Sequence, residues 1–290
     1  MPFTISHAAA VLPFMRRDGS GRGRLVPSLL VAGSFAPDLT YFAAGAVPEA
    51  MEFGDVTHSF AGVCTVDVLF ALALVGLVRV LRDPVLGLLP GRIRGRAAAP
   101  RPGSAGRGGR GRAVVWWYVS AVLGATTHVV WDAFTHPGRW GVRLFPVLDE
   151  NVAGSPLYWY VQYGTSALAL VVVAGFVWRA RVSGGQEGGR GGSVRGPVAA
   201  SAGRRWAAAV LIGGCVCGCV VLRVGRWLDA VHTAGLTWKP WEVIPALCFG
   251  AGAGFALGLV LYAGVYYAGM GRGRVQGPDR VAQPSRPSGR

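Results

Sequence analysis

Residues 113–134 of this chain read AVVWWYVSAVLGATTHVVWDAF, an apolar run that carries His128 and Asp132 near its end. A helix needs about 20 apolar residues to cross the hydrocarbon core of a bilayer, so this run has the length of a membrane span. A His and an Asp inside such a run are energetically costly, and polar groups at that depth usually serve a function. This stretch therefore indicates both the class of the fold and the place of a site.

Four further apolar runs of similar length follow the same pattern along the chain: 61–81, 157–178, 206–224 and 243–268. Hydrophobic residues make up 52% of the 290 residues, and charged residues only 15%. An ordinary soluble domain carries about 25% charged residues, so the composition argues against a soluble enzyme. We expect an all-α, polytopic transmembrane helix bundle.

The start of the chain departs from this pattern. Residues 5–15 are apolar, residues 16–24 are polar with four Arg, and residues 25–44 are apolar again but interrupted by Pro37 and Asp38. Eleven apolar residues are too few to cross a bilayer. The pattern therefore predicts an N-terminal re-entrant helical hairpin followed by five full spans. The alternative is six plain spans, with residues 25–44 as the first.

Positive charge alternates along the chain. Of the 29 Lys and Arg residues, 24 lie in four segments: 16–24, 79–112, 179–205 and 271–290. The other connecting segments are 45–60, 135–156 and 225–242. Together they contain only four Lys and Arg residues. Because cytoplasmic loops of membrane proteins are enriched in Lys and Arg, this alternation places the Arg-rich segments in the cytoplasm.

Three segments are rich in Gly, Arg, Pro and Ser: 91–112, 181–205 and 271–290. Such composition cannot build a packed core. We therefore expect a single membrane-embedded domain over residues 1–270, with flexible cytoplasmic loops and a disordered cytoplasmic tail. The Arg residues are predicted to contact anionic lipid of the bilayer. No aromatic residues are interleaved for stacking on bases, so we expect no nucleic-acid partner.

The most specific chemical signal is the spacing His128-x-x-x-Asp132-x-x-x-His136. Residues four apart share one face of a helix, so the three side chains form one stripe. His and carboxylate side chains are the usual ligands of zinc and related metals. Pro137 and Gly138 end the helix, so His136 is expected near the membrane surface and not deep in the lipid. The alternative is a polar stripe that is hydrogen-bonded to neighbouring helices.

A second His lies on the same side of the predicted topology. His58, in the sequence Thr57-His58-Ser59, precedes the run 61–81 and is a further candidate ligand. Asp67 follows nine residues later. In one continuous helix it would point to the opposite face from His58 and lie roughly 13 Å deeper in the membrane. These two residues therefore need not bind the same ion. Asp67 is one candidate for a general base, and the alternative is a protonated or hydrogen-bonded structural Asp.

Two residues of the predicted hairpin complete the candidate site. Pro37 interrupts the second helix of the hairpin, and Asp38 falls at or just beyond the break. A broken helix can present a carboxylate at membrane depth where it faces other protein groups. His7 begins the first helix of the hairpin and would lie level with Asp38. The alternatives are an Asp38 that only ends the apolar stretch and a His7 that is free in the cytoplasm.

Together these motifs resemble a bacterial membrane-protein family catalogued as domain of unknown function 4184. The likeness covers roughly residues 1–268 and is carried by the following motifs: Met1-Pro2-Phe3-Thr4, Ser6-His7, Gly33-Ser34, Ala36-Pro37-Asp38, Thr57-His58-Ser59, His128-x-x-x-Asp132 with Thr135-His136, and Gln162-Tyr163-Gly164. The resemblance implies a multi-pass protein of the bacterial cell membrane.

The chain is more distantly similar to inner-membrane proteins that are described as metal-dependent hydrolases regulated by the SOS repressor. Those proteins also show an early His, a Pro-Asp, a Thr-His-Ser and a membrane His-x-x-x-Asp. Two of their potential ligands are missing here, because Phe53-Gly54-Asp55-Val56 replaces a His-Arg-Gly and Pro37-Asp38-Leu39-Thr40 replaces a Pro-Asp-x-Asp. The resemblance implies hydrolase chemistry only in part.

We therefore expect a metal-dependent hydrolase that acts on a lipid-derived substrate at the extracytoplasmic side, with Asp132 or Asp67 as the general base. The predicted cofactor is a zinc-like divalent ion, held by all or some of six residues: His7, Asp38, His58, His128, Asp132 and His136. The alternative is a non-catalytic membrane protein whose polar cluster is structural or carries an ion. A transporter is disfavoured, because no inverted repeat is evident.

Overall fold

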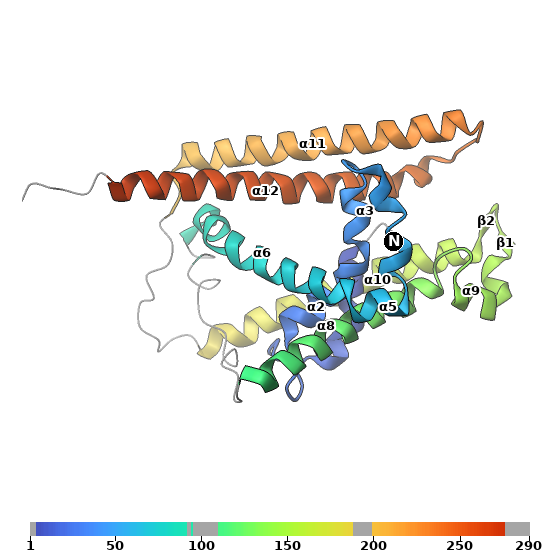
Figure 1. The fold of residues 1–290 in the computed structure, drawn as a ribbon, viewed down its shortest axis with the longest axis horizontal. Coiled ribbons are helices and arrows are strands. Elements are labelled where there is room, and N and C mark those ends of the chain that lie inside the picture. The colour runs from blue at the N-terminus through green and yellow to red at the C-terminus, as the bar shows by residue number, and fades with distance from the viewer. Residues whose placement is uncertain (1–3, 92–93, 95–109, 188–198, 276–290) are drawn as a thin grey trace, which may run out of the picture.

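The computed structural model describes residues 4–91, 94, 110–187 and 199–275 (Figure 1). The predicted flexible segments fall mostly outside the described residues, which leave out 92–93, 95–109, 188–198 and 276–290. Within the described part the predicted all-α class is confirmed, because the only strands are two-residue elements that pair as one small antiparallel ribbon.

The elements follow one another in this order, with η for short 3₁₀ helices: η1 Thr4–His7, α1 Ala8–Val11, η2 Leu12–Phe14, α2 Pro27–Phe35, η3 Ala36–Asp38, α3 Leu39–Ala43, η4 Pro48–Met51, α4 Gly54–Thr57, α5 Phe60–Cys64, α6 Val66–Leu88, α8 Arg110–Ala133, α9 Trp140–Leu144, η5 Pro146–Asp149, β1 Asn151–Val152, β2 Ser155–Pro156, α10 Leu157–Glu187, α11 Ala202–Thr233, η7 Pro240–Val243 and α12 Ile244–Val275.

Four described helices are long and apolar enough to cross a membrane: Gly111–Ala133, Leu157–Ala180, Ala202–Thr233 and Pro240–Met270. They coincide with four of the five predicted runs. The remaining run, 61–81, is divided at Thr65, whose backbone (φ −128°, ψ −79°) separates α5 from α6. Because α6 also carries charged residues, it is not among the four.

The helices extend beyond the predicted apolar runs. Helix α10 continues through residues 181–187, α12 continues to Val275, and α8 begins at Arg110. Helix α11 begins at Ala202, where the Ser201 hydroxyl accepts a hydrogen bond from the backbone N–H of Arg204. These residues were expected in flexible segments. In the structure they belong to helices.

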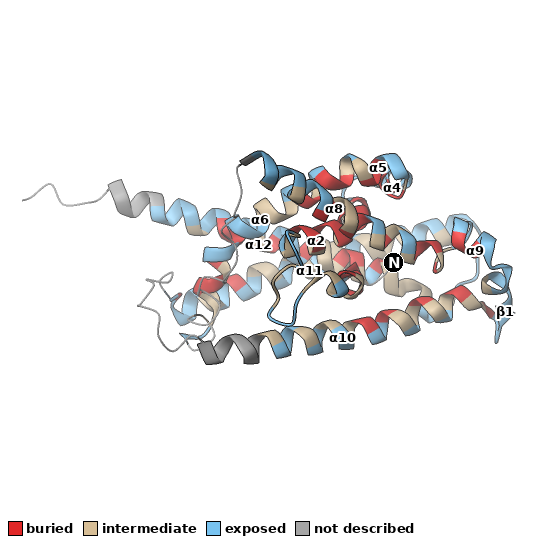
Figure 2. Cartoon of the chain, turned by 90° about the horizontal axis from the view of Figure 1, so that it is seen from below, coloured by how far each residue is buried: buried red, intermediate tan, exposed pale blue. Residues whose placement is uncertain are grey.

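The centre of the molecule is the packing of α2 against α8. A Cβ atom on Gly33 would overlap the carbonyl of Ala121, and one on Gly124 would overlap the carbonyl of Leu30, so both glycines bring the two backbones into close approach. Small residues at such crossings are typical of helix packing in membranes. Figure 2 shows buried residues concentrated on these helices, and they include one apolar cluster: Leu29, Ala32, Ala36, Val68, Ala71 and Ala121.

Helices α11 and α12 form a long antiparallel pair along one side of the molecule (Figure 1). Gly250, Gly254 and Gly258 recur every four residues on α12 and face α11, where an added Cβ would press on the backbone of that helix. The pair touches the rest of the protein mainly through contacts of α12 with α3 and α6. The site therefore lies in the other part, around α2, α8 and the N-terminal segment.

Candidate metal centre

Helix α8 supplies the centre of the candidate site. His128 and Asp132 lie one turn apart on its buried face, and both side chains are almost fully buried. The close approach at Gly33 brings the carbonyl oxygen of Ser34 to 2.8 Å from His128 Nδ1. Because a carbonyl can only accept, Nδ1 must carry the proton and donate it. The other ring nitrogen of His128, Nε2, is then the one available to bind an ion.

Two carboxylates face this nitrogen. His128 Nε2 lies 3.3 Å from Asp132 Oδ2 and 3.4 Å from Asp38 Oδ1. Asp38 ends η3, directly after Pro37 interrupts the path from α2 to α3. Its second oxygen, Oδ2, accepts a hydrogen bond of 2.5 Å from the hydroxyl of Thr4. The Asp38 carboxylate is therefore held between the N-terminal segment and α8.

His58 approaches the same centre from a different segment. It follows the last residue of α4, and its Nδ1 donates to the carbonyl of Gly54 at 2.8 Å. Its Nε2 lies 3.5 Å from Asp132 Oδ2. The neighbouring Thr57 hydroxyl donates to the carbonyl of Pro37 at 2.8 Å, which joins this segment to the turn that carries Asp38. His58 thus repeats the arrangement of His128.

These four residues form one compact group. One ligand atom from each of Asp38, His58, His128 and Asp132 lies within 4.8 Å of all the others, and all four side chains are buried. A tetrahedral ion with bonds of 2.0–2.2 Å holds neighbouring ligand atoms roughly 3.3–3.6 Å apart. The His–Asp distances of 3.3 to 3.5 Å fall in that range. The group could hold a metal ion.

The other two predicted His ligands, His7 and His136, lie beside Asp132 and outside this group. The ring of His7 stacks on that of His128, with 3.6 Å between centroids, and its Nε2 lies 3.4 Å from Asp132 Oδ1. His136 follows α8, with Nδ1 3.6 Å from Asp132 Oδ2 and Nε2 3.2 Å from the amide nitrogen of Gln162. All six predicted ligands are therefore brought together around Asp132.

A family model described as domain of unknown function DUF4184 matches residues 1–264. The chain belongs to this family. The matched region contains every residue of the four-residue group, and it confirms the resemblance that the sequence motifs carry. No curated protein and no solved structure matches the chain, so these comparisons do not show the more distant likeness to hydrolases.

Asp67, the second predicted general base, is placed differently from the six His and Asp residues. It lies in the first turn of α6, is fully buried, and does not belong to the four-residue group. Neither of its carboxylate oxygens makes a hydrogen bond with any residue that the structure describes. Among the described residues, Asp67 is therefore not hydrogen-bonded to the other candidate residues.

Three residues that orient the site were not assigned a role from the sequence. The hydroxyl of Thr4 donates to Asp38, the carbonyl of Ser34 accepts from His128, and the amide of Gln162 contacts His136. Each of them belongs to a motif of the family resemblance. A polar residue within the apolar run 157–178 is a usable signal for Gln162, and Thr4 directly precedes the run 5–15. No sequence signal could identify Ser34, because it acts through its backbone.

A small pocket opens beside the group. Its volume is about 40 Å³, and it is lined by His58, Val129, Asp132, Ala133, Arg139 and Trp140. One water molecule needs roughly 10–15 Å³ of such space, so the pocket has room for a few waters or one small chemical group. Two residues of the four-residue group, His58 and Asp132, thus line an open space.

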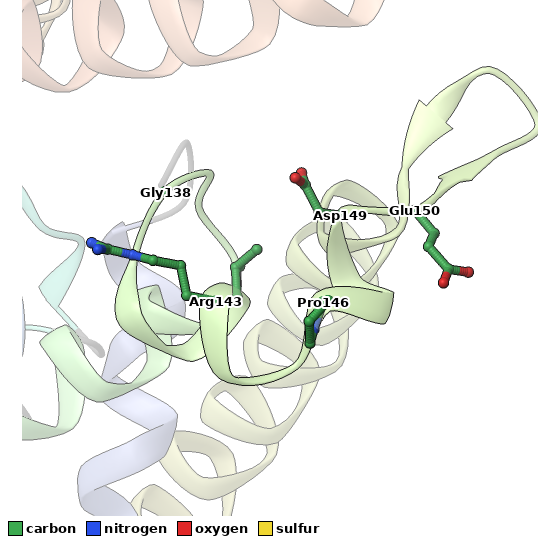
Figure 3. Close-up of a pocket in the computed structure, with 6 residues that line it drawn as sticks. Gly138, Arg143, Pro146, Asp149 and Glu150 are labelled. Atoms are coloured by element: carbon green, nitrogen blue, oxygen red, sulfur yellow. The ribbon is translucent and has the colours of Figure 1, made fainter.

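A larger depression, of about 330 Å³, lies beside α9 and η5 (Figure 3). None of the six candidate ligands lines it. Arg143 and Glu150 point away from each other in this depression, so its charged side chains do not converge on a common point (Figure 3). Of these two pockets, only the small one borders the candidate centre.

Proposed function

We propose that this chain is a multi-pass membrane protein in which Asp38, His58, His128 and Asp132 bind one zinc-like divalent ion that serves hydrolysis of a lipid-derived ester. One observation carries the proposal. Both His residues donate Nδ1–H to a backbone carbonyl, and both Nε2 atoms approach carboxylate oxygens at the spacing of ligands around one ion. Such second hydrogen bonds orient His ligands in metal proteins.

The chemistry of the donors favours a zinc-like ion. Two imidazole nitrogens and two carboxylate oxygens suit zinc and neighbouring transition metals, whereas calcium and magnesium prefer oxygen ligands alone. A divalent charge would balance the two buried carboxylates of Asp38 and Asp132. Without a cation, and with His128 neutral, these carboxylates would approach an Nε2 atom that has no proton to donate, which is unfavourable in a buried site.

The pocket lined by His58 and Asp132 gives room for water beside the four protein ligands, and zinc in catalytic sites can expand to five ligands in the transition state, so this pocket supports a catalytic centre. When bound, such an ion lowers the pKa of water enough to make it a nucleophile near neutral pH. In the hydrolysis a water oxygen attacks the ester, the ester bond breaks, and the alcohol leaves with a proton.

We assign the acceptance of the water proton to Asp132, which lines this pocket. The Oδ1 atom of Asp132 faces His7 Nε2 at 3.4 Å, so His7 is positioned to take the proton onward. Asp67 lines neither pocket and makes no hydrogen bond to this group among the described residues, so it receives no step in the proposal.

The proposed topology combines five spans with the re-entrant hairpin. The N-terminal segment from η1 to η2 packs beside α2, and residues 15–26 turn between them. In this topology α6 is the fifth span, and the Arg-rich segments, including the turn, face the cytoplasm and contact anionic lipid. The metal centre then faces the extracytoplasmic side of a bacterial cell membrane.

The alternative function is a non-catalytic membrane protein with a structural polar cluster. It is favoured by the position of His128 Nε2, which faces both Asp38 and Asp132 and would pair with both if protonated. An imidazolium between two carboxylates would balance one of their two negative charges without an ion. Metal content separates these two functions.

The test is metal analysis of protein purified in detergent without chelators. We expect about one zinc-like ion per chain in the native protein, and at least a tenfold loss in Asp132→Asn at the same free-metal concentration. His232→Ala is the matched control, because His232 is an exposed His outside the site. A monodisperse native protein that binds no divalent ion would overturn the proposal and support the structural alternative.

A further inference from the structure

The pocket beside the metal-binding group contains one positive charge. Its six lining residues comprise two of the ligands, His58 and Asp132, three apolar residues, and Arg139. Arg139 is therefore the only cationic side chain among the residues that line this opening. Arg139 thus lines the same opening as two of the candidate ligands, His58 and Asp132.

The local backbone explains why Arg139 reaches this position. Helix α8 ends at Ala133, and the chain reverses at Gly138, whose φ of +68° lies in the left-handed region that glycine tolerates. Arg139 follows immediately and precedes the first residue of α9. The turn thus folds Arg139 back over the helix end that carries Asp132.

Arg139 is only weakly engaged by the protein itself. Its recorded ion pair is with Asp55, with 3.7 Å between Nη2 and Oδ1, and the side chain of Asp55 is 89% exposed. Ion pairs at such exposed positions contribute little, typically less than about 1 kcal/mol. An anion that enters the pocket can therefore take the place of Asp55 at low cost.

We propose that Arg139 binds the phosphoryl group of the substrate, so that the substrate class of the proposed hydrolase is a phosphate ester. This inference rests on the proposed function. The two carboxylates of the group balance the charge of a divalent ion. The positive charge that remains beside the pocket is that of Arg139, and an anionic substrate would complement it. Its planar fork of donors matches phosphate oxygens in a bidentate manner. A neutral carboxylic ester would give this charge no partner.

The size of the pocket fits this assignment. A volume of about 40 Å³ accepts one small group but not a whole lipid or sugar, so the rest of the substrate must lie outside. Large apolar side chains are exposed on both segments that flank the pocket: Phe60 at 87% lies two residues after His58, and Trp140 at 49% follows Arg139. A phosphate group can reach the pocket from a lipid or from a soluble ester.

The reaction balances as a hydrolysis. A water oxygen forms a bond to phosphorus, the bond between phosphorus and the ester oxygen breaks, and the alcohol leaves with one proton. The second proton of the water passes to Asp132 or to the phosphate released. Arg139 contributes by holding two phosphoryl oxygens while negative charge shifts to the leaving oxygen.

The test measures binding of inorganic phosphate to zinc-loaded protein by titration calorimetry, with metal content determined on the same samples. Arg139→Ala should keep its metal and bind phosphate roughly 10- to 100-fold more weakly, the usual effect of losing charge-assisted hydrogen bonds. Arg143→Ala is the matched control, because Arg143 lies on α9, is exposed and lines the other depression. It should bind phosphate within twofold of the native protein.

Asp55→Asn separates anion binding from a structural role of the ion pair. If Arg139 serves only to hold Asp55, this variant should behave like Arg139→Ala. If Arg139 binds phosphate, the removal of the competing carboxylate should leave phosphate affinity equal or higher. An Arg139→Ala protein with full metal content and unchanged phosphate affinity would overturn the inference while leaving the metal centre intact.

Two competitors of inorganic phosphate distinguish the source of the group: soluble glycerol 3-phosphate, and phosphatidic acid presented in nanodiscs of a neutral lipid. Competition by phosphatidic acid alone identifies a lipid headgroup, and competition by both identifies a phosphate ester of either source. In each case the competition must depend on Arg139. If neither competes, the inference is wrong. If the native protein binds no metal, the proposed function itself fails.

Discussion

His128 Nδ1 donates a hydrogen bond of 2.8 Å to the carbonyl oxygen of Ser34, 94 residues earlier in the chain. This single bond determines which ring nitrogen of His128 faces Asp38 and Asp132. It exists only because Gly33 and Gly124 allow α2 and α8 to approach closely. A packing detail of two membrane-type helices thus determines the donor chemistry of the candidate site.

Removal of the ion should destabilise the folded protein. When the ion is removed, the buried carboxylates of Asp38 and Asp132 lie close together without a positive charge between them and repel each other. Chelator treatment should therefore lower the thermal unfolding midpoint in detergent. Addition of zinc should restore it, with a midpoint that rises with zinc concentration. His232→Ala should respond in the same way as the native protein. An identical midpoint with and without chelator would contradict a bound ion in the purified protein.

Thr4→Val should weaken metal binding without removing a ligand. The hydroxyl of Thr4 orients Asp38, and the loss of such an outer partner typically costs 10- to 100-fold in metal affinity. Competition with a fluorescent zinc chelator measures this affinity. Thr40→Val is the matched control, because the buried hydroxyl of Thr40 has no hydrogen-bond partner in the described structure. If both variants lose the same affinity, the effect is general packing and not the hydrogen bond to Asp38.

His7→Phe should separate proton transfer from metal binding. Phenylalanine keeps a ring that can stack on His128 but removes the nitrogen that faces Asp132. We expect full metal content and at least a tenfold loss of hydrolysis of a phosphate ester such as 4-nitrophenyl phosphate, a typical effect of losing a general acid–base group. A folded His7→Phe protein that loses its metal would instead make His7 a ligand.

Gly254→Ala should loosen the pair of α11 and α12. A Cβ atom at position 254 would overlap the backbone of α11 at Cys215 and Val216, and overpacking of this kind costs about 1–3 kcal/mol. The thermal unfolding midpoint should fall. Gly264→Ala on the same helix meets open space, so it should be neutral or stabilising through helix propensity. The prediction is wrong if the two variants have equal midpoints.

Cysteine labelling of intact cells tests the topology. In a background without the five native cysteines, a membrane-impermeant reagent should label Asp149→Cys, because the segment 139–156 is proposed to face outward. Ser104→Cys, in the Arg-rich segment 91–112, should react only after the cells are permeabilised. Labelling of Ser104→Cys from outside would reverse the topology and place the metal centre on the cytoplasmic side.

Local sequence patterns predicted the helices well, and the breaks less well. An apolar run such as 113–134 can satisfy its backbone groups within lipid only as a helix, so its structure follows from its length and composition. The run 61–81 looked equally continuous, but the structure interrupts it at Thr65 and continues as α6. Hydropathy averages over a window and does not register one non-helical residue, so the break was not predicted.

The sequence by itself determined that the protein is helical and membrane-like, and that His128 and Asp132 share one helix face, because a period of 3.6 residues is a local property. It also indicated that His7, Asp38 and His58 are polar residues in apolar surroundings, which must find polar partners within the protein. Only the tertiary structure decided which atoms meet. His58 and Asp38 reach Asp132 and His128 through packing of distant segments, while Asp67 does not join them. Contacts between segments depend on crossing geometry, glycine positions and backbone carbonyls, and one-dimensional spacing does not encode these.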